Sequence, residues 1–399
     1  MKTREVKLGE VANVKGGKRI PKGIGLINIP NGHPYIRVRD LNNKRLLELD
    51  NSYEYVDNET QKVISKYTVK TGDVVLSIVG TIGLVAIVGR TLDGANLTEN
   101  CVKLSSFHGV NRDFLYYYLR SDCGQQEIRC GTVGAVQAKL PIKNIQNIAI
   151  NLPDYTTQER IASLLLSIDR KIELNQKIND NLEQQAVTYF QELYINNANP
   201  MWQIGTISDL GTVVGGSTPS KTKPEYYTNN GIAWITPKDL SINKSKFISH
   251  GENDITELGL KNSSATVMPK GTVLFSSRAP IGYIAIASNE VTTNQGFKSV
   301  IPYLEIGTAF VYFFLKHRLP VIESAASGST FKEISGSAMK NIPAIIPDRS
   351  TLDQFNSFCA PIFAQQKNLE AQNYSLAMLR DSLLPKLMSG AIDIASIQL

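Results

Sequence analysis

Cysteine and histidine are scarce in this chain, which has four of each among 399 residues. The cysteines stand at positions 101, 123, 130 and 359, and none forms a C-x-x-C pair. This spacing argues against both a disulfide framework and a zinc site, and it is typical of a protein kept in a reducing cytoplasm. The opening residues MKTREVKLGE are charged and lack an apolar stretch, so they do not have the pattern of a secretory signal.

Long hydrophobic runs are lacking as well. The strongest candidate for a membrane span, VVLSIVGTIGLVAIVG, covers only residues 74–89 and is interrupted by glycines. A helix needs roughly 20 apolar residues to cross the hydrocarbon core, so this run is too short. Two buried strands joined by a glycine turn are the better interpretation.

Hydrophobic residues make up 42% of the chain and charged residues 20%, a balance that predicts two or three globular domains. The charges alternate in blocks. Lys and Arg outnumber Asp and Glu by 21 to 14 over residues 1–150 and by 13 to 10 over residues 200–347. Acidic residues are in excess over residues 151–199 and 348–399. Two basic blocks suit a polyanionic ligand.

The sequence is an internal duplication. At a constant offset of 199, Gly16-Gly17 falls on Gly215-Gly216. With small gaps the match continues to FLYYYLR (114–120), which aligns with FVYFFLK (310–316). We therefore expect each half to contain a domain of the same fold.

Short β-branched runs between Gly, Asn and Pro turns predict strands in both halves, and helices are predicted at 112–120 and 308–318. The expected fold class is α+β, with two duplicated mixed α/β domains. The predicted strands are Tyr35–Val38, Val74–Ile78, Val85–Val88, Ala233–Thr236, Val273–Ser276 and Tyr283–Ala287.

The stretch GGSTPSKT (215–222) comes within one residue of a P-loop, with Ser220 in place of the second glycine. Its counterpart GGKRIPKG (16–23) has no hydroxyl residue after its lysine. A phosphate cradle needs the lysine, a Ser or Thr, and an amide nest that opens a helix, so the duplication argues against a nucleotide site. We expect the paired glycines to form a tight turn with positive φ.

Heptad patterns predict two long helices, Thr157–Leu193 and one from Thr351 to about Leu384. Apolar residues recur along both segments at the 3.5-residue spacing of a coiled-coil seam. Capping-box patterns, Thr156-x-x-Glu159 and Ser350-x-x-Asp353, mark the predicted starts of the helices.

Polar residues interrupt each seam near its midpoint: Asn175 and Asn179 in the first helix, Gln366 and Asn373 in the second. Antiparallel pairing would bring these amides together, where they could satisfy each other and fix the register. The alternative is that they lie just off the seam and face water. Antiparallel helices would relate the two domains by a pseudo-twofold axis, which suits a DNA duplex. Because the two halves of the chain differ in sequence, we expect the DNA site to be bipartite and non-palindromic.

The expected organisation has four segments. Residues 1–153 form a first DNA-binding domain and 154–197 a first long helix that acts as a central spacer. Residues 198–347 form a second DNA-binding domain, and 348–399 form the second long helix and the C-terminal tail.

Two helical stretches resemble a known family. TTQERIASLLLSIDRKIELNQKI (156–178) and LRDSLLPKLMSGAI (379–392) look like the two helical repeat regions of the specificity subunit of type I restriction–modification enzymes. The resemblance covers essentially the whole chain. One departure is Phe363, which stands in the second helix where the first has Asp169.

The resemblance implies a non-catalytic subunit whose two target-recognition domains read a bipartite, asymmetric DNA site in the cytoplasm. It also implies that two methyltransferase subunits dock on the helices and that motor-nuclease subunits join the complex. S-adenosylmethionine, ATP and Mg²⁺ would then belong to the partners, with no cofactor or metal in this chain and no membrane contact. In agreement, the sequence has neither an Asn/Asp-Pro-Pro-Tyr/Phe methyltransferase motif nor an intact Walker A motif.

Residues that differ between the copies within equivalent loops are candidates for base readout, and shared residues are expected to hold the fold. Three pairs of loops qualify: those after the paired glycines, 79–81 with 278–280, and 131–140 with 328–337. Arg278 is the strongest candidate, because arginine on guanine is the commonest specific contact. A phosphate contact or a surface ion pair is the alternative for Arg278. The shared residues are Gly72 and Gly271, Gly83 and Gly282, and Asp40 and Asp239.

Further candidates lie at the ends of predicted strands. Asn294-Gln295 and Lys298 align with Glu99-Asn100 and Lys103 at an offset of 195. The Asn or Gln side chain could pair with adenine, or it could cap the edge of a strand. Arg37, Arg39 and Lys238 lie beside Asp40 and Asp239 at the ends of predicted strands. They could contact DNA phosphates, or they could face water at the strand end. The complete set of candidate DNA-binding residues is Lys18, Arg19, Lys22, Arg37, Arg39, Gln137, Lys139, Thr218, Lys221, Lys223, Lys238, Arg278, Asn294, Gln295, Lys298 and Lys332, with Ser329 and Thr330 in the third loop.

Three other functions compete with this interpretation. The chain could be the specificity module of another modification system, for example one with a fused nuclease and methyltransferase. It could also be a coiled-coil scaffold for proteins, which predicts no salt-dependent DNA affinity. An NTPase that uses GGSTPSKT would require Lys221 for nucleotide binding.

Overall fold

The computed structural model describes residues 2–41, 44–328 and 332–394 of the chain. It divides into two compact units. The first unit contains the residues up to Ile172 and those from Ser375 onward, and the second unit runs from Glu173 to Tyr374. Both long helices cross this boundary, so each unit consists of one globular domain and the adjoining parts of the two helices.

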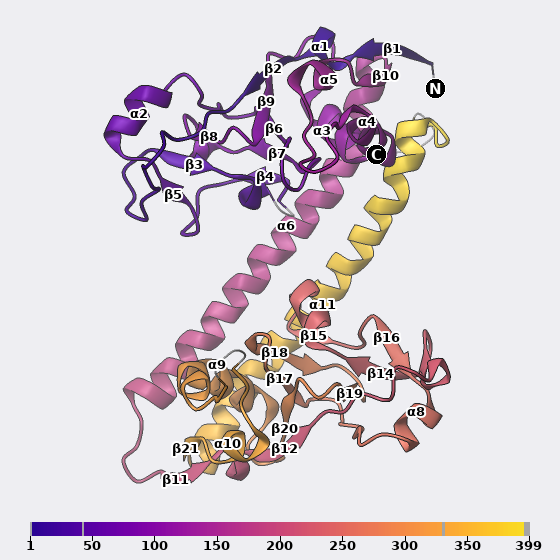
Figure 1. The fold of residues 1–399 in the computed structure, drawn as a ribbon. Helices are drawn as coiled ribbons and strands as arrows, with labels where there is room; N and C mark the ends of the chain where they lie inside the picture. The colour runs from indigo at the N-terminus through magenta and orange to yellow at the C-terminus, as the bar shows by residue number, and fades with distance from the viewer. Residues whose placement is uncertain (1, 42–43, 329–331, 395–399) are drawn as a thin grey trace. The chain divides into compact units, whose positions relative to one another are not determined.

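The first unit is built on a five-stranded sheet with the order β2-β9-β6-β7-β4 and a three-stranded sheet with the order β5-β3-β8 (Figure 1). The antiparallel pair β1-β10 joins the start of the domain to its end. The strands are β1 (Thr3–Lys7), β2 (Asn13–Gly16), β3 (Pro34–Ile36), β4 (Leu46–Leu47), β5 (Glu54–Tyr55), β6 (Val74–Ser77), β7 (Val85–Val88), β8 (Asn96–Leu97), β9 (Cys101–Ser105) and β10 (Ala149–Pro153). The helices are α1 (Leu8–Val11), α2 (Asn58–Ile64), α3 (Arg112–Arg120), α4 (Asp122–Gly131) and α5 (Ile142–Gln146), with 3-10 turns at Val38–Leu41 and Arg90–Leu92.

The second unit repeats this plan, with the five-stranded order β12-β20-β17-β18-β15, the four-stranded order β13-β16-β14-β19 and the pair β11-β21. The strands are β11 (Gln203–Thr206), β12 (Gly211–Gly215), β13 (Tyr227–Thr228), β14 (Ile232–Ile235), β15 (Phe247–Ile248), β16 (Asn253–Ile255), β17 (Val273–Ser277), β18 (Ile281–Ala287), β19 (Thr292–Thr293), β20 (Lys298–Pro302) and β21 (Pro343–Ile346). The helices are α7 (Pro237–Ile242), α8 (Glu257–Lys261), α9 (Thr308–Ser324) and α10 (Gly336–Lys340), with 3-10 turns at Ile207–Asp209 and Pro224–Tyr226. Because the five-stranded sheets have the same order and strand directions, the predicted duplication is confirmed as a duplication of the fold.

The predicted strands are confirmed with small shifts at their ends. The apolar run 74–89 forms the antiparallel pair β6-β7, and Val74 and Val75 are fully buried in it. No helix within the described residues is long and apolar enough to cross a membrane. Val38 belongs to a 3-10 turn instead of a strand, because the Asp40 carboxylate accepts the backbone N–H of Arg37 (2.7 Å) and turns the chain.

Two further expectations concern turns and helices. The Asp239 carboxylate accepts the backbone N–H of Thr236 (2.7 Å), and Asp40 accepts that of Arg37 in the first unit, so both aspartates cap a turn and hold the fold as expected of residues that the copies share. The helix predicted at 112–120 matches α3, whereas α9 runs six residues past its predicted end at 318. It continues through Pro320 because Ile322 is fully buried in the core of the second unit.

The long helices are α6 (Tyr155–Gln191), followed by a π-helical turn at Glu192–Asn196, and α11 (Arg349–Ser389). In the second unit they run antiparallel, because Asn175 contacts Asn373 while Tyr189 stacks on Phe355 further along. In the first unit Asp169 pairs with Arg380 (2.9 Å), while Ile161 earlier in α6 shares a core with Leu387 later in α11. The predicted antiparallel pairing is therefore confirmed within each unit.

The predicted pairing of seam amides is confirmed in the second unit. The amide of Asn175 donates to Oδ1 of Asn373 (2.9 Å), and that of Gln366 donates to the backbone carbonyl of Asn179 (3.1 Å). Asn175 is fully buried and Gln366 is 3% exposed, so the alternative of solvated amides is wrong for these two residues. The expected pseudo-twofold relation between the domains stays a prediction.

The predicted capping boxes are wrong. The carboxylate of Asp154 accepts the backbone N–H of Thr157 (2.9 Å), so Asp154 caps α6. Asp348 accepts the N–H of Thr351 (2.9 Å) in the same way at the start of α11. An ionised carboxylate attracts the positive end of the helix dipole as well as the N–H group, which favours an Asp cap over the Thr or Ser that follows it.

The departure at Phe363 is matched by a second change in the domain. In the first unit Asp169 accepts the hydroxyl of Tyr117 (2.6 Å) and pairs with Arg380 (2.9 Å). In the second unit the counterparts of Tyr117 and Asp169 are Phe313 and Phe363, whose rings lie 6.0 Å apart. A polar contact between domain and helix in one copy is therefore an aromatic contact in the other. The contact keeps its position and changes its chemistry.

Candidate nucleic-acid interface

The loop after the paired glycines lies directly against the chain that follows β8 or β19. A Cβ on Gly17 would lie 2.0 Å from the carbonyl oxygen of Thr98, and one on Gly216 would lie 1.9 Å from that of Asn294. Neither glycine has a positive φ, so the predicted turn is wrong and close backbone approach is the reason for glycine here. The four shared glycines predicted to be structural, Gly72, Gly83, Gly271 and Gly282, do have positive φ.

The loop GGSTPSKT does not open a phosphate-binding helix. The residues after Lys221 form the short 3-10 turn Pro224–Tyr226. A P-loop requires a helix whose first amides point at the phosphates, so the geometry agrees with the prediction against a nucleotide site.

Equivalent positions in this loop use different chemistry in the two units. Nε of Arg19 donates to Oε1 of Glu99 (2.5 Å), and at the same place the hydroxyl of Thr218 contacts the side-chain oxygen of Gln295. Burial raises the pKa of Glu99, but the hydrogen bonds from Arg19, from the backbone and from Thr98, together with the charge of Arg19, outweigh it, and the pKa of this carboxyl lies below its ordinary value. The structure thus brings the first loop together with the segment that contains Glu99 or Gln295.

The strand register corrects one predicted alignment. Gly16 of β2 pairs with Val102, and Gly215 of β12 pairs with Lys298. Lys298 is therefore equivalent to Val102, at an offset of 196 instead of 195. A shift of one residue moves a side chain to the other face of a strand, so the predicted match of Lys298 with Lys103 is wrong.

The second and third candidate loops pair with each other in both units. Val79 forms a β-bridge with Lys139 in the first unit, and Arg278 forms one with Glu333 in the second. Lys139 is therefore equivalent to Glu333, which shifts the predicted alignment of the third loop by three residues. At this position one unit presents a cation and the other a carboxylate.

Glu333 contacts two of the candidate DNA-binding cations of the second unit, Arg278 and Lys298. Its Oε2 lies 3.4 Å from Nη1 of Arg278, and its Oε1 lies 3.6 Å from Nζ of Lys298. The side chains of Arg278 and Glu333 are 38% and 37% exposed, so both can reach a ligand. Arginine suits guanine and a carboxylate suits the amino group of cytosine. Sequence reasoning missed Glu333 because its partner Arg278 lies 55 residues away.

Some predicted contacts are already engaged within their units. Arg37 and Arg39 both pair with the carboxylate of Glu54, and Lys238 pairs with Glu252 (2.6 Å). The side chain of Arg37 is only 25% exposed. These three cations therefore lie at the strand ends predicted for them, but a phosphate would have to compete with a carboxylate.

Asn294 is engaged in a turn as well. Its Oδ1 accepts the backbone N–H of Gly296 (2.9 Å), which is the capping alternative considered for it.

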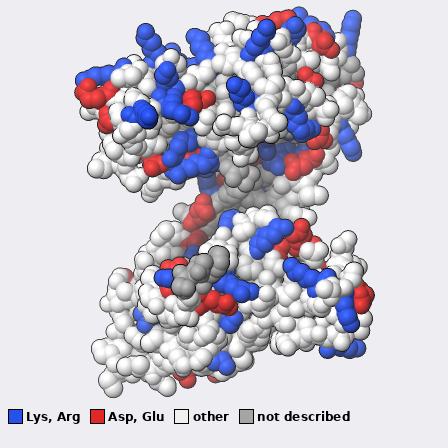
Figure 2. Space-filling view, viewed as in Figure 1, with Lys and Arg blue, Asp and Glu red and all other residues white. Residues whose placement is uncertain are grey.

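The remaining candidates are exposed and have no ion-pair partner among the described residues. The ammonium group of Lys18 lies 5.6 Å from the ring centre of Tyr67, and that of Lys223 lies 5.3 Å from Tyr226. Figure 2 shows Lys and Arg side chains spread over the visible face of the first unit. Ser329 and Thr330 lie outside the described residues. The exposed candidates are Lys18, Lys22, Gln137, Lys139, Lys221, Lys223 and Lys332.

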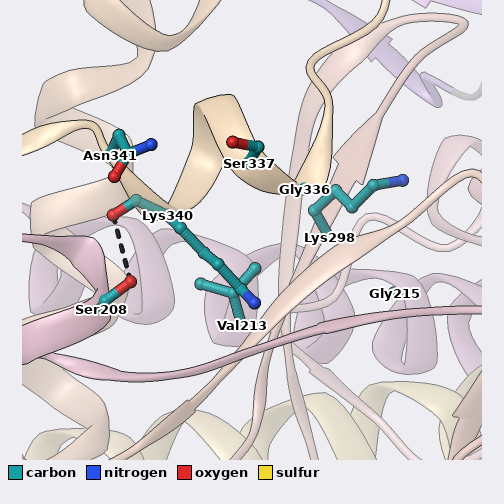
Figure 3. A pocket seen from close by; sticks show the side chains of 8 residues that line it. All are labelled: Ser208, Val213, Gly215, Lys298, Gly336, Ser337, Lys340 and Asn341. Atoms are coloured by element: carbon teal, nitrogen blue, oxygen red, sulfur yellow. Dashed lines mark hydrogen bonds between the residues drawn. The ribbon is translucent and has the colours of Figure 1, made fainter.

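Lys298, which pairs with Glu333, also lines a depression of about 450 Å³ in the second unit (Figure 3). Lys298 of β20 and Lys340 of α10 line it together with Ser337 and Asn341. The backbone carbonyl of Lys340 accepts the hydroxyl of Ser208 (3.3 Å), which ties α10 to the turn before β12. No Asp or Glu is among the residues that line the depression. Within the described part of the chain, no group of three or more His, Cys, Asp or Glu residues could hold a metal ion.

The comparison with known families follows the duplicated architecture. The family model for the type I restriction modification DNA specificity domain matches residues 2–184 and again residues 199–372. The chain belongs to this family. The two matches correspond to the two copies of the fold and include most of both long helices.

Relatives and solved structures agree with this assignment. The type I restriction enzyme MjaIX specificity subunit of Methanocaldococcus jannaschii is 43% identical over 162 residues, which are 40% of this chain and 37% of that protein. The HindI specificity subunit of Haemophilus influenzae is 24% identical over 341 residues, covering 67% of this chain and 73% of that protein. The crystal structure of the S subunit of a type I restriction–modification system from M. genitalium has a TM-score of 0.57 and 16% identity, covering 97% of this chain and 99% of that one. This likeness shows that the specificity-subunit fold extends over nearly the whole chain.

Proposed function

We propose that this chain is the DNA-recognition subunit of a type I restriction–modification complex and reads a bipartite, asymmetric site with its two domains. One observation carries the proposal: a single fold occurs twice with different polar residues at equivalent loop positions. Arg19, Val79 and Lys139 in the first unit stand where the second has Thr218, Arg278 and Glu333. Two domains that share a scaffold and differ in their loops suit two different half-sites.

The chemistry of the second domain favours direct readout of a base pair. Arg278 can donate two hydrogen bonds to guanine, and Glu333 beside it can accept one from the amino group of the paired cytosine. The exposed lysines around the loops suit phosphates, which position the duplex without reading its sequence. In the first domain Lys139 takes the place of Glu333, so we expect a different base there.

The helices supply surfaces for protein partners. In the second unit Leu174 of α6 and Tyr374 of α11 are 52% and 71% exposed, and burial of these side chains against a partner would remove apolar area from water. We assign these surfaces to two methyltransferase subunits, with motor-nuclease subunits joining the complex through them. In this proposal the present chain is non-catalytic, and S-adenosylmethionine, ATP and Mg²⁺ bind to the partners.

The test replaces Arg278 with valine, the residue at the equivalent position 79 of the first copy. The variant is produced with its methyltransferase partner, and the methylated motif is mapped by single-molecule sequencing. The proposal expects the bases read by the second domain to change or become degenerate while the other half of the motif stays the same. Lys270→Ala serves as the control, because this exposed lysine is not among the candidate DNA-binding residues. Loss of both half-sites together, with the complex still assembled, would contradict independent readout.

The alternative function is a protein scaffold that does not bind DNA. A DNA-binding measurement on the same preparation of the complex distinguishes the two functions. A DNA reader loses affinity for duplex steeply as salt rises, with a slope set by the number of phosphates it neutralises. An assembled complex that shows no binding even at low salt would favour the scaffold.

A further inference from the structure

The surroundings of the depression beside Lys298 differ from those of the equivalent place in the first copy. In the first unit the Cδ1 atom of Ile142 lies 3.4 Å from the place where a Cβ on Gly16 would stand, so this side chain closes the space. In the second unit the equivalent of Ile142 is Gly336, and nothing lies within 4 Å of the same place on Gly215. The equivalence follows from the hydrogen bonds that join Leu140 to Ile78 and, in the second unit, Ile334 to Ser277.

Two lysines accompany the opening of this space. Lys298 stands where the first copy has Val102, and Lys340 stands where it has Gln146. The side chains flank the depression in Figure 3, and a Cβ on Gly336 would lie 3.8 Å from Cε of Lys298. Compared with the first copy, the second unit has Gly336 and Ser337 in place of Ile142 and Lys143 and gains Lys298 and Lys340. The result is a depression lined by two cations and no carboxylate.

A carboxylate outside the lining of this depression already pairs with one of its lysines. The carboxylate of Glu333 holds the ammonium group of Lys298 at 3.6 Å and the guanidinium of Arg278 at 3.4 Å. The first copy has Lys139 in place of Glu333 and valines in place of both cations. The carboxylate is therefore present in the copy that has these cations and absent from the copy that has valines in their place. This is expected of an internal group that neutralises the cations until a phosphate displaces it.

We infer that this depression, formed by Gly336, Lys298 and Lys340, binds a backbone phosphate of the DNA held by the second domain, with Glu333 as its internal competitor. The inference rests on the proposed function. A phosphate suits the site because lysine ammonium groups and the hydroxyl of Ser337 are donors that its oxygens accept. DNA is its source in this proposal, because Lys298 links the depression to Arg278, and backbone phosphates flank any base that an arginine reads.

The experiment measures the affinity of the full chain for two duplexes, one with the methylated motif and one unrelated, over a range of salt concentrations. Lys340→Gln is expected to weaken both about three- to tenfold and to reduce the salt slope by about one. Gly336→Ile refills the space as Ile142 does and is expected to act in the same direction. Glu333→Gln frees both cations and is expected to strengthen binding to the unrelated duplex, in which the proposed contact of Glu333 with cytosine has no part. Matched controls are Lys270→Gln, an exposed lysine outside the depression, and Ile142→Gly in the first copy.

Lys340→Gln and Glu333→Gln are expected to change the affinity for the unrelated duplex in opposite directions, which a general loss of folding would not produce. Affinities within twofold of the wild-type chain for Lys340→Gln and Gly336→Ile, with melting curves unchanged, would overturn the inference. So would weaker binding of the unrelated duplex by Glu333→Gln.

A separate arm titrates the DNA-free chain with inorganic phosphate and follows the amide resonances of residues 336 and 337. Shifts that vanish in Gly336→Ile, together with the losses of DNA affinity, support the site. Shifts without any change in DNA affinity would assign it to a free phosphate ligand and overturn the DNA assignment. If the wild-type chain binds no DNA while the phosphate shifts persist, the proposed function fails and the anion site remains.

Discussion

Lys246 holds the second domain to both long helices, and its replacement by methionine should destabilise the second unit strongly. The lysine precedes β15, and its side chain is only 7% exposed. Its ammonium group pairs with Glu183 of α6 and donates to Oε1 of Gln366 of α11 (2.6 Å). It also lies 4.3 Å from the ring centre of Phe363.

The magnitude follows from what Lys246→Met leaves behind. Methionine keeps the apolar contacts with the rings but leaves Glu183 with one ammonium partner, Lys316 (2.6 Å). Removal of one member of a buried ion pair costs about 3–5 kcal/mol when the other charge is stranded. Because Glu183 is 22% exposed and keeps Lys316, we expect a loss of about 2–3 kcal/mol in the free energy of unfolding of the second unit.

The assay uses the tryptophans of the protein. The sequence has two, Trp202 and Trp234, and both belong to the second unit, so their fluorescence during urea unfolding reports on that unit. Lys244→Met is the matched control, because this exposed lysine makes a cation–π contact with Tyr283 and should cost less than about 1 kcal/mol. A loss for Lys246→Met no larger than that of the control would refute the reasoning.

The pH dependence gives the same prediction an independent check. Burial raises the pKa of Glu183, but the ammonium groups of Lys246 and Lys316 outweigh burial, and the pKa lies below its ordinary value of 4.5. A lowered carboxyl pKa contributes stability that is present above pH 4.5 and is lost as pH falls through the folded-state pKa. The wild-type second unit should therefore lose this contribution in acid, and Lys246→Met should lose less of it.

Three further substitutions test other contacts. Burial raises the pKa of Glu370, so the stability it contributes is lost as pH rises through that pKa. Its two oxygens accept the backbone N–H groups of Lys246 (2.8 Å) and Phe247 (3.1 Å), so Glu370→Gln leaves one of these N–H groups without an acceptor and should cost about 1–3 kcal/mol in urea unfolding at pH 7; equal stability would contradict this role. Tyr117→Phe removes the hydrogen bond to Asp169 and should destabilise the first unit by about 1 kcal/mol, measured by circular dichroism; an unchanged midpoint would count against that contact. Gly216→Ala places a Cβ on the carbonyl oxygen of Asn294 and should cost more than about 2 kcal/mol, seen in the fluorescence of Trp234, whose indole donates to Ser217 (3.0 Å).

The features predictable from the sequence are those that depend on periodicity or on repetition. The heptad pattern located both long helices, because a seam needs apolar residues at fixed spacing whatever the partner. Comparison of the two halves located the strands and the shared turns at Asp40 and Asp239. The same comparison explains why Phe363 replaces Asp169, once Phe313 is seen to replace Tyr117.

The parts of the site that could not be predicted depend on register and on distant partners. Loops gain and lose residues freely, so a constant offset between the copies fails where Lys298 aligns with Val102 and where Glu333 aligns with Lys139. The partner of Arg278 is distant in sequence, and local patterns carry no information about it. The helix caps were missed because Asp154 and Thr156 are both good N-caps, and only the structure shows which one binds the free amide.

The central claim is that this chain alone decides which DNA sequence is modified. The most direct measurement is a methylome: the chain is expressed with its methyltransferase partner in a host without DNA methylation, and N6-methyladenine is mapped by single-molecule sequencing. The account predicts a gapped, asymmetric motif that vanishes when the chain is omitted and changes in one half only with Arg278→Val. An assembled, soluble complex that leaves the genome unmethylated, or a motif indifferent to the chain, would contradict it.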